Sequence, residues 1–104
     1  MKKLEVYVPE SHLESVKAAM FEAGGGKVGV YDSCAWQTLG QGQYRPLEGS
    51  DPYQGQKGKV ERASEYKLEM VCTDARVQAV IAAMKQAHPY EEVAFSVLAT
   101  ESVS

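Results

Sequence analysis

The residues with the richest chemistry in this 104-residue chain form one stretch near its end, His88-Pro89-Tyr90-Glu91-Glu92. An imidazole beside carboxylates can hold a divalent transition metal ion, or it can take part in acid–base chemistry. His88, Glu91 and Glu92 are therefore the candidate metal ligands, and Zn²⁺ or Cu²⁺ are the ions that this donor set suits. Because the chain has only two histidines, a closed structural zinc site is not expected.

A structural role for the same stretch is the competing hypothesis, and the sequence favours it over metal binding. Pro89 cannot continue a helix, and it disfavours helical geometry at His88. His88 should therefore end a helix, where the helix dipole favours a positive charge and would raise the pKa of the imidazole. In this interpretation Tyr90 and Glu91 form hydrogen bonds across a subunit edge.

Two helices that position this stretch are predicted from apolar residues at helical spacing. Ser11 and Glu14 can form a capping box at the start of the first helix, and Thr73-Asp74 offers caps for the second. The first apolar face comprises Leu13, Val16, Met20 and Phe21, and the second comprises Val77, Val80, Ile81 and Met84. Three glycines, Gly24, Gly25 and Gly26, should end the first helix in a tight turn. They also permit close backbone approach to a ligand, although a plain turn is favoured.

Strands are predicted where apolar and polar residues alternate or where β-branched and aromatic residues gather, at residues 4–8, 28–36, 59–72 and 93–99. Ser64-Glu65 is expected to bend or bulge the third of these strands. Glycine and proline interrupt residues 37–58, which predicts a long loop or hairpin arm. Such a long segment in a small domain is suited to ligand contact or to a subunit interface.

An internal repeat organises these elements. Residues 16–23 and 80–87 share five identities in eight positions, and in both copies a helix lies between two strands. Right-handed crossovers place both helices on one face of a single sheet. The repeat therefore predicts one α+β domain over residues 1–104, with a ferredoxin-like antiparallel sheet. In this alignment the three glycines of the first copy correspond to His88-Pro89-Tyr90 of the second.

Composition narrows the classes of partner. The net charge is -3 and no basic cluster occurs, which argues against nucleic acid. No apolar run approaches the ~20 residues of a membrane-spanning helix, and the lysines near the start precede no apolar signal region. We therefore expect a soluble cytoplasmic protein with no membrane partner. Cys34 and Cys72 lack a C-x-x-C spacing and are expected to be free thiols. In the metal-binding alternative, His12, Cys34 or Cys72 could join His88 and the carboxylates as a further ligand.

Four motifs in order resemble the CutA-like (PII-like) domain of the YqfO family, the dinuclear-metal proteins labelled type-two GTP cyclohydrolases. They are Phe21-Glu22-Ala23-Gly24, Tyr31-Asp32-Ser33-Cys34, Gly42-Gln43-Tyr44-Arg45-Pro46-Leu47-Glu48-Gly49 and His88-Pro89-Tyr90-Glu91-Glu92. The last motif more distantly resembles CutA divalent-cation-tolerance proteins. The resemblance implies a PII/CutA-like fold that assembles through its sheets, commonly as a trimer, and it implies no established catalytic activity.

The resemblance also suggests where a ligand would bind, because PII-like trimers hold ligands in clefts between subunits. The candidate ligand-binding residues are Gly24, Gly25, Gly26, Asp32, Arg45 and Tyr90. In the full-length family, separate histidine- and carboxylate-rich halves carry the metal site, and we do not expect hydrolase activity without them. The predicted function is a non-enzymatic, oligomeric binding or regulatory module. A divalent metal-binding protein is the alternative, and an enzyme ranks last because no nucleophile motif or P-loop is present.

Overall fold

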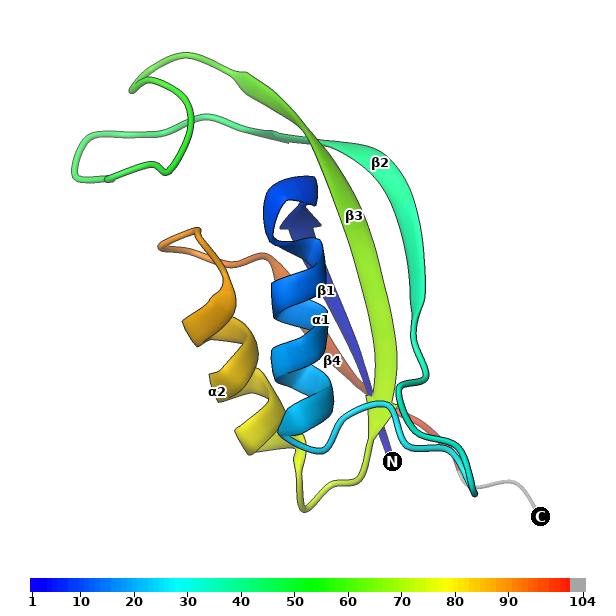
Figure 1. Ribbon diagram of the computed structural model, residues 1–104. Helices are drawn as coiled ribbons and strands as arrows, with labels where there is room; N and C mark the ends of the chain where they lie inside the picture. The colour runs from blue at the N-terminus through cyan, green and yellow to red at the C-terminus, as the bar shows by residue number, and fades with distance from the viewer. Residues whose placement is uncertain (102–104) are drawn as a thin grey trace.

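One antiparallel sheet of four strands carries both helices on the same face (Figure 1). The computed structural model describes residues 1–101. The elements are β1 (Lys2–Pro9), the 3₁₀ helix η1 (Glu10–His12), α1 (Leu13–Glu22), β2 (Trp36–Tyr44), β3 (Glu61–Cys72), α2 (Val77–Ala87) and β4 (Phe95–Ala99). The strand order is β2-β3-β1-β4, and each neighbouring pair is antiparallel. The ferredoxin-like α+β fold predicted from the internal repeat is confirmed.

The hydrophobic core lies between the sheet and the two helices. On β1, Leu4, Val6 and Val8 are at most 1% exposed, while Tyr7 between them faces the other side of the sheet. The repeated helix positions are buried in both copies: Val16 and Val80, and Met20 and Met84. Phe21 and Ile81 pack against this core and are half-buried. Burial of these stripes, rather than local preference, holds the helices on the sheet. None of the helices within residues 1–101 is long and apolar enough to cross a membrane.

The two predicted helix caps are wrong. His12 is the N-cap of α1 and Arg76 that of α2, and neither side chain makes a capping hydrogen bond. Ser11 Oγ instead lies 2.8 Å from Nδ1 of His12, because the turn of η1 leads directly into the helix. Asp74 pairs with the N-terminal amine at 3.1 Å. Tertiary contacts and the preceding turns therefore set both helix starts.

The second strand lies later in the chain than predicted. Residues 28–35 form turns with a single bridge between Val28 and Tyr31, and β2 begins at Trp36. β2 pairs with β3 without interruption from Trp36 opposite Glu69 to Tyr44 opposite Glu61. Of the bend or bulge expected at Ser64-Glu65, the bulge is therefore absent. Residues 37–44 of the expected loop at 37–58 are thus strand, and β2 and β3 form a long curved arm (Figure 1). The hairpin-arm alternative is the one that the structure adopts.

The three glycines form the predicted tight turn after α1. Gly24 and Gly26 have φ values of +113° and +75°, which favour glycine. The Gly26 N–H donates to the carbonyl of Val71 at 2.8 Å, and a Cβ on Gly26 would meet the ring of Phe21 at 2.7 Å. The turn therefore packs against its own surroundings.

Candidate functional site

A cleft of about 390 Å³ lies where the tip of the arm approaches the turn after α2. Its walls come from four parts of the chain: β1 at Tyr7, the end of β2 with the following loop 45–53, β3 at Glu65, and the turn at Tyr90. Figure 1 shows the loop at the tip of the arm and the turn after α2 on the same side of the molecule. Segments far apart in sequence thus build one concave surface, which is the usual form of a ligand site.

Aromatic rings form much of this cleft. The centroid of Tyr90 lies 6.1 Å from that of Tyr44 and 5.9 Å from that of Tyr53. His12 meets Tyr53 edge-on at 5.9 Å, which supports the loop from η1. The hydroxyl of Tyr44 donates to the carbonyl of Gln54 at 2.6 Å. These contacts hold the loop against the rest of the domain.

Glu91 fastens the loop to the turn after α2. Its Oε1 accepts a hydrogen bond of 2.8 Å from the backbone N–H of Asp51. A charge-assisted bond of this kind is stronger than one between neutral groups. The cleft therefore has a cross-connection at its rim between two residues that are 40 positions apart.

His88 lies behind the cleft and is 7% exposed. Its Nε2 lies 2.8 Å from the carbonyl oxygen of Tyr7, and its Nδ1 lies 3.2 Å from the backbone nitrogen of Tyr90. These partners assign the tautomer: Nε2–H donates to Tyr7, and Nδ1 accepts from Tyr90. Burial lowers the pKa of His88, although the Tyr7 bond opposes this shift. The expected raised pKa is therefore wrong in direction, because desolvation outweighs the helix end.

The hydroxyl of Tyr90 is buried and has no hydrogen-bond partner within residues 1–101. The carboxylate of Glu65, whose residue is 9% exposed, is near enough to act on Tyr90 but does not meet it in hydrogen-bond geometry. Burial is the main cause that raises the pKa of Tyr90, and Glu65 raises it further. The phenol therefore keeps its proton at neutral pH, and its oxygen is a polar atom without a partner in the cleft wall.

The structure brings together only some of the residues that the sequence suggested. Arg45, Tyr90, Glu91 and Glu92 line the cleft, and His88 supports Tyr90 from behind. The turn of three glycines lies at the opposite end of α2, where Gly24 contacts Arg76, about 16 Å away along the 11 residues of the helix.

Asp32 is part of the turn near those glycines. Its carbonyl is 3.5 Å from Sγ of Cys34, and the N–H of Cys34 donates to the carbonyl of Gly26. Asp32 and the glycine turn therefore do not belong to the cleft in one chain.

The residues do not fit a metal site within one chain. No group of three histidine, cysteine, aspartate or glutamate residues in the described part of the chain could hold a metal ion. His88 has both ring nitrogens engaged with the backbone, so its lone pair is already used. Cys34 and Cys72 are free thiols, and burial raises the pKa of Cys72, which disfavours the thiolate that binds metal.

Glu65 and Tyr7 are lining residues that the sequence reasoning missed. The only sequence feature that marks Glu65 is the presence of a carboxylate inside a predicted strand. Tyr44 and Tyr53 lie within residues 37–58, the segment for which ligand contact or a subunit interface was expected. Which of these residues share a cleft depends on the pairing of β2 with β3, and the sequence placed that strand too early.

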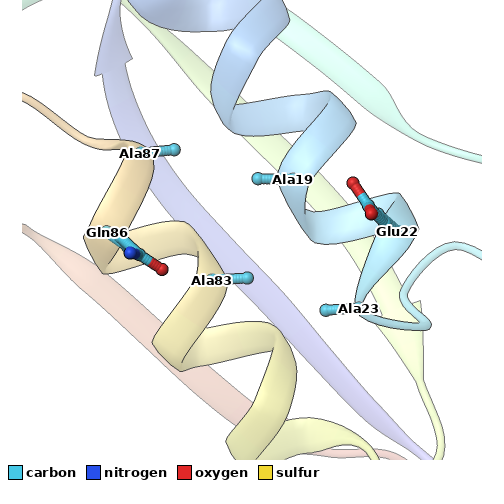
Figure 2. A pocket seen from close by; sticks show the side chains of 6 residues that line it. All are labelled: Ala19, Glu22, Ala23, Ala83, Gln86 and Ala87. Atoms are coloured by element: carbon cyan, nitrogen blue, oxygen red, sulfur yellow. The ribbon is translucent and has the colours of Figure 1, made fainter.

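A second hollow lies between the two helices on their outer side and reflects the internal repeat. Figure 2 shows Ala87 opposite Ala19 and Ala83 opposite Ala23 across the groove, with Glu22 and Gln86 beside them. Ala19 and Ala23 are the repeat equivalents of Ala83 and Ala87. The small side chains let the helices pack closely, so the groove is explained by helix packing.

The architecture is that of a ferredoxin-like α+β domain with an extended hairpin arm. The family described as "CutA1 divalent ion tolerance protein" matches residues 53–104. This chain belongs to the CutA1 family, which the motif around His88 resembled more distantly.

Longer proteins contain a region similar to nearly the whole chain. A "GTP cyclohydrolase 1 type 2 homolog" of Bacillus subtilis is 44% identical over 101 residues, which cover 97% of this chain and 27% of that protein. The crystal structure of a Bacillus cereus protein related to NIF3 is 38% identical with a TM-score of 0.84, covering 97% of this chain and 26% of the other. The chain thus spans about a quarter of the length of these relatives, and the predicted resemblance is confirmed.

A CutA1 structure shares the fold at low sequence identity. CutA1 from Pyrococcus horikoshii superposes with a TM-score of 0.72 at 16% identity, covering 100% of this chain and 87% of the other. This likeness concerns the arrangement of the sheet and helices alone.

Proposed function

We propose that the chain is a non-enzymatic, oligomeric module that binds a small ligand in the cleft beside Tyr90. The observation that carries this proposal is the cleft of about 390 Å³, with a buried Tyr90 hydroxyl that has no partner in residues 1–101. Small-molecule sites are typically concave and mostly apolar, with a few polar groups that converge on the ligand. An unpartnered buried hydroxyl is costly unless something binds to it.

Neither His88 nor Tyr90 is suited to act as a general base in this cleft. A general base needs a free lone pair within reach of the substrate. His88 engages both nitrogens with backbone groups, and Tyr90 holds its proton because burial raises its pKa. The name of the longer relatives describes proteins of which this chain spans about a quarter, and it supplies no reaction for this cleft.

Self-association is the second part of the proposal, with a homotrimer as the expected assembly. Both outer strands, β2 and β4, have unpaired edges within the described chain. Trp36 and Leu39 on β2 are 69% and 59% exposed, and Val97 and Leu98 on β4 are 40% and 44% exposed. Open apolar strand edges are rarely left uncovered. Light scattering at micromolar concentration should give three times the mass of one chain, and the mass of one chain would contradict the proposal.

A divalent metal ion is the second candidate ligand, favoured by the description of the family as divalent ion tolerance proteins. Its ligands would have to come from more than one subunit, because the described residues of one chain offer no group of three. Calorimetric titration of Zn²⁺ or Cu²⁺ at pH 7.5 into the wild type and His88→Ala tests this candidate. We expect weak binding, and equal heats in both proteins would rule out a role for His88.

A fragment screen by two-dimensional amide NMR tests the proposed binding function. A ligand in the cleft should shift the amide signals of Asp51, Tyr90 and Glu91 together, since these lie at one rim. Tyr90→Phe removes the unpartnered hydroxyl and should weaken polar ligands. Tyr31→Phe removes a hydroxyl from a residue that is 72% exposed, and serves as the matched control. If no fragment shifts the signals of the cleft, the proposed function is wrong.

A further inference from the structure

Glu65 is an almost fully enclosed carboxylate without a cationic partner. The residue is 9% exposed, and no ion pair to it within 4.0 Å occurs among residues 1–101. By contrast, Glu69 on the same strand pairs with Lys3 at 2.7 Å. Enclosing an unpaired charge is costly, and a nearby cation recovers much of that cost. Within residues 1–101, the carboxylate of Glu65 therefore has no positive charge paired with it.

Gly42 allows the carboxylate to occupy this place. A Cβ built on Gly42 would overlap the carboxylate of Glu65, so the side chain lies across β2 only because position 42 has none. Gly42 has no positive φ, so its backbone conformation does not require glycine. Gly40, two residues away on β2, has open space at its Cβ position. The two glycines therefore differ in their contact with Glu65.

The surroundings of Glu65 are aromatic and acidic. Four tyrosines line the cleft, and the carboxylates of Glu65, Glu91 and Glu92 outnumber the single guanidinium of Arg45. The faces of aromatic rings attract cations. The Tyr90 hydroxyl has an oxygen that can accept an N–H, and it lies beside Glu65. Ring faces, a carboxylate and a free hydroxyl oxygen are together the partners that an ammonium group needs.

We propose that the ligand of this cleft is a small protonated amine, an inference that rests on the proposed function. Its ammonium N–H groups donate to the Glu65 carboxylate and to the Tyr90 hydroxyl oxygen. Its hydrocarbon part lies against the tyrosine rings and the prolines of the loop, Pro46 and Pro52. An anion of the same size is disfavoured by the three carboxylates.

Three probes of similar length test the sign of the charge: n-butylammonium, n-butanol and n-butyrate, each titrated at pH 7 and followed by amide NMR. The amine is protonated at this pH because its pKa is close to that of lysine. We expect n-butylammonium to bind most tightly and to shift the signals of Glu65, Tyr90 and Glu91. Tighter binding of n-butanol or n-butyrate in the cleft would overturn the inference and leave the proposed function standing.

Three variants test the role of Glu65. Glu65→Gln should weaken n-butylammonium on the order of ten-fold or more, since hydrogen bonds to charged groups are the strong ones. Gly42→Ala should weaken it in the same direction by displacing the carboxylate. Gly40→Ala is the matched control and should leave affinity unchanged. Circular dichroism of each variant verifies that the fold is retained, and equal affinity in folded Glu65→Gln and wild type would overturn the inference.

The remaining outcomes separate the two proposals. If no probe and no fragment shifts the signals of the cleft, both the inference and the proposed function are wrong. If fragments bind there and n-butylammonium does not, only the inference is wrong. If Glu65→Gln changes the mass of the assembly measured by light scattering, Glu65 of the wild type is paired with a cation of a second copy. That result would also overturn the inference.

Discussion

The Nε2 atom of His88 donates a 2.8 Å hydrogen bond to the carbonyl oxygen of Tyr7, just beyond the point where β4 stops pairing with β1. The N–H of Tyr7 still donates to the carbonyl of Ala94 at 3.1 Å. In a regular antiparallel pair, the Tyr7 carbonyl would accept from the opposite backbone. The imidazole provides that donor instead, so His88 continues the edge of the sheet with a side chain.

The first prediction follows from this bond. His88→Ala should lower the free energy of unfolding at pH 7.5 by about 1–3 kcal/mol, because it leaves a buried carbonyl without a donor. Urea denaturation measures this change. Ser15→Ala, an exposed position on α1, is a suitable control and should change stability by no more than about 0.5 kcal/mol. A loss for His88→Ala as small as that of the control would contradict a structural role.

The pH dependence of the free energy of unfolding should show the effect of the lowered pKa of His88. Its folded pKa is lowered from the ordinary 6.5 chiefly by burial, while Glu65 and His12 are the charged groups that also act on it. The unfolded state then binds more protons between the two pKa values. The stability that His88 contributes is therefore complete above about 6.5 and is lost as pH falls through the folded pKa.

Comparison with His88→Gln isolates this effect, because the variant keeps Glu65 and His12 but has no titrating group at position 88. Urea midpoints between pH 7.5 and pH 5 should fall further for the wild type than for His88→Gln. A smaller fall for the wild type would mean a raised pKa and a cationic helix cap.

The internal repeat makes a prediction about the core. Met20 and Met84 occupy equivalent positions and are each 1% exposed. Met84→Ala and Met20→Ala should each cost roughly 2–5 kcal/mol, as other buried large-to-small changes do. Gln78→Ala on the exposed side of α2 is the control and should be nearly neutral. A loss for Met84→Ala below half of 1 kcal/mol would show that this face is not core.

The glycine turn should be needed for folding. Gly26→Ala introduces a Cβ at 2.7 Å from the Phe21 ring and at 2.8 Å from the carbonyl oxygen of Cys34, at a φ of +75°. The expected loss is about 2 kcal/mol or more, from backbone strain and overpacking together. Gly29→Ala has a φ of +59° but open space, so it should show about 1 kcal/mol from strain alone. Equal losses in thermal or urea unfolding would show that the contacts of Gly26 do not matter.

The open edge of β2 should be the place where self-association can be broken. Leu39→Lys puts a charge at an edge position that is 59% exposed, and charged edges resist pairing. Light scattering should show a shift to a lower mass at the same concentration. Gln78→Lys adds the same charge to an exposed position of α2 and should leave the mass unchanged. An unchanged mass for Leu39→Lys would place the interface elsewhere.

The sequence alone determined the class of fold. Two helical stripes with the same spacing, repeated between strands, admit few arrangements that bury both faces on one sheet. Met20 and Met84 lie where that repeat requires. The glycine turn could also be predicted from the sequence, because a positive φ is a local backbone property that few residue types other than glycine tolerate.

The position of β2 was decided by tertiary structure. Val28 and Val30 are β-branched but lie in exposed turns, whereas Gly40 and Gly42 lie in a strand that disfavours glycine. Pairing with β3 supplies the hydrogen bonds that local preference does not. The same pairing sets Gly42 beside Glu65 and brings the loop at 45–53 to Tyr90.

The candidate site depends on that pairing. The motif around His88 pointed to the correct end of α2, because its residue types are unusual and contiguous. It could not show that the imidazole is buried with both nitrogens used, since its partner Tyr7 lies 81 residues away. Desolvation and long-range contacts decide which side chains face a cleft and which support it from behind, and only the folded chain brings those groups together.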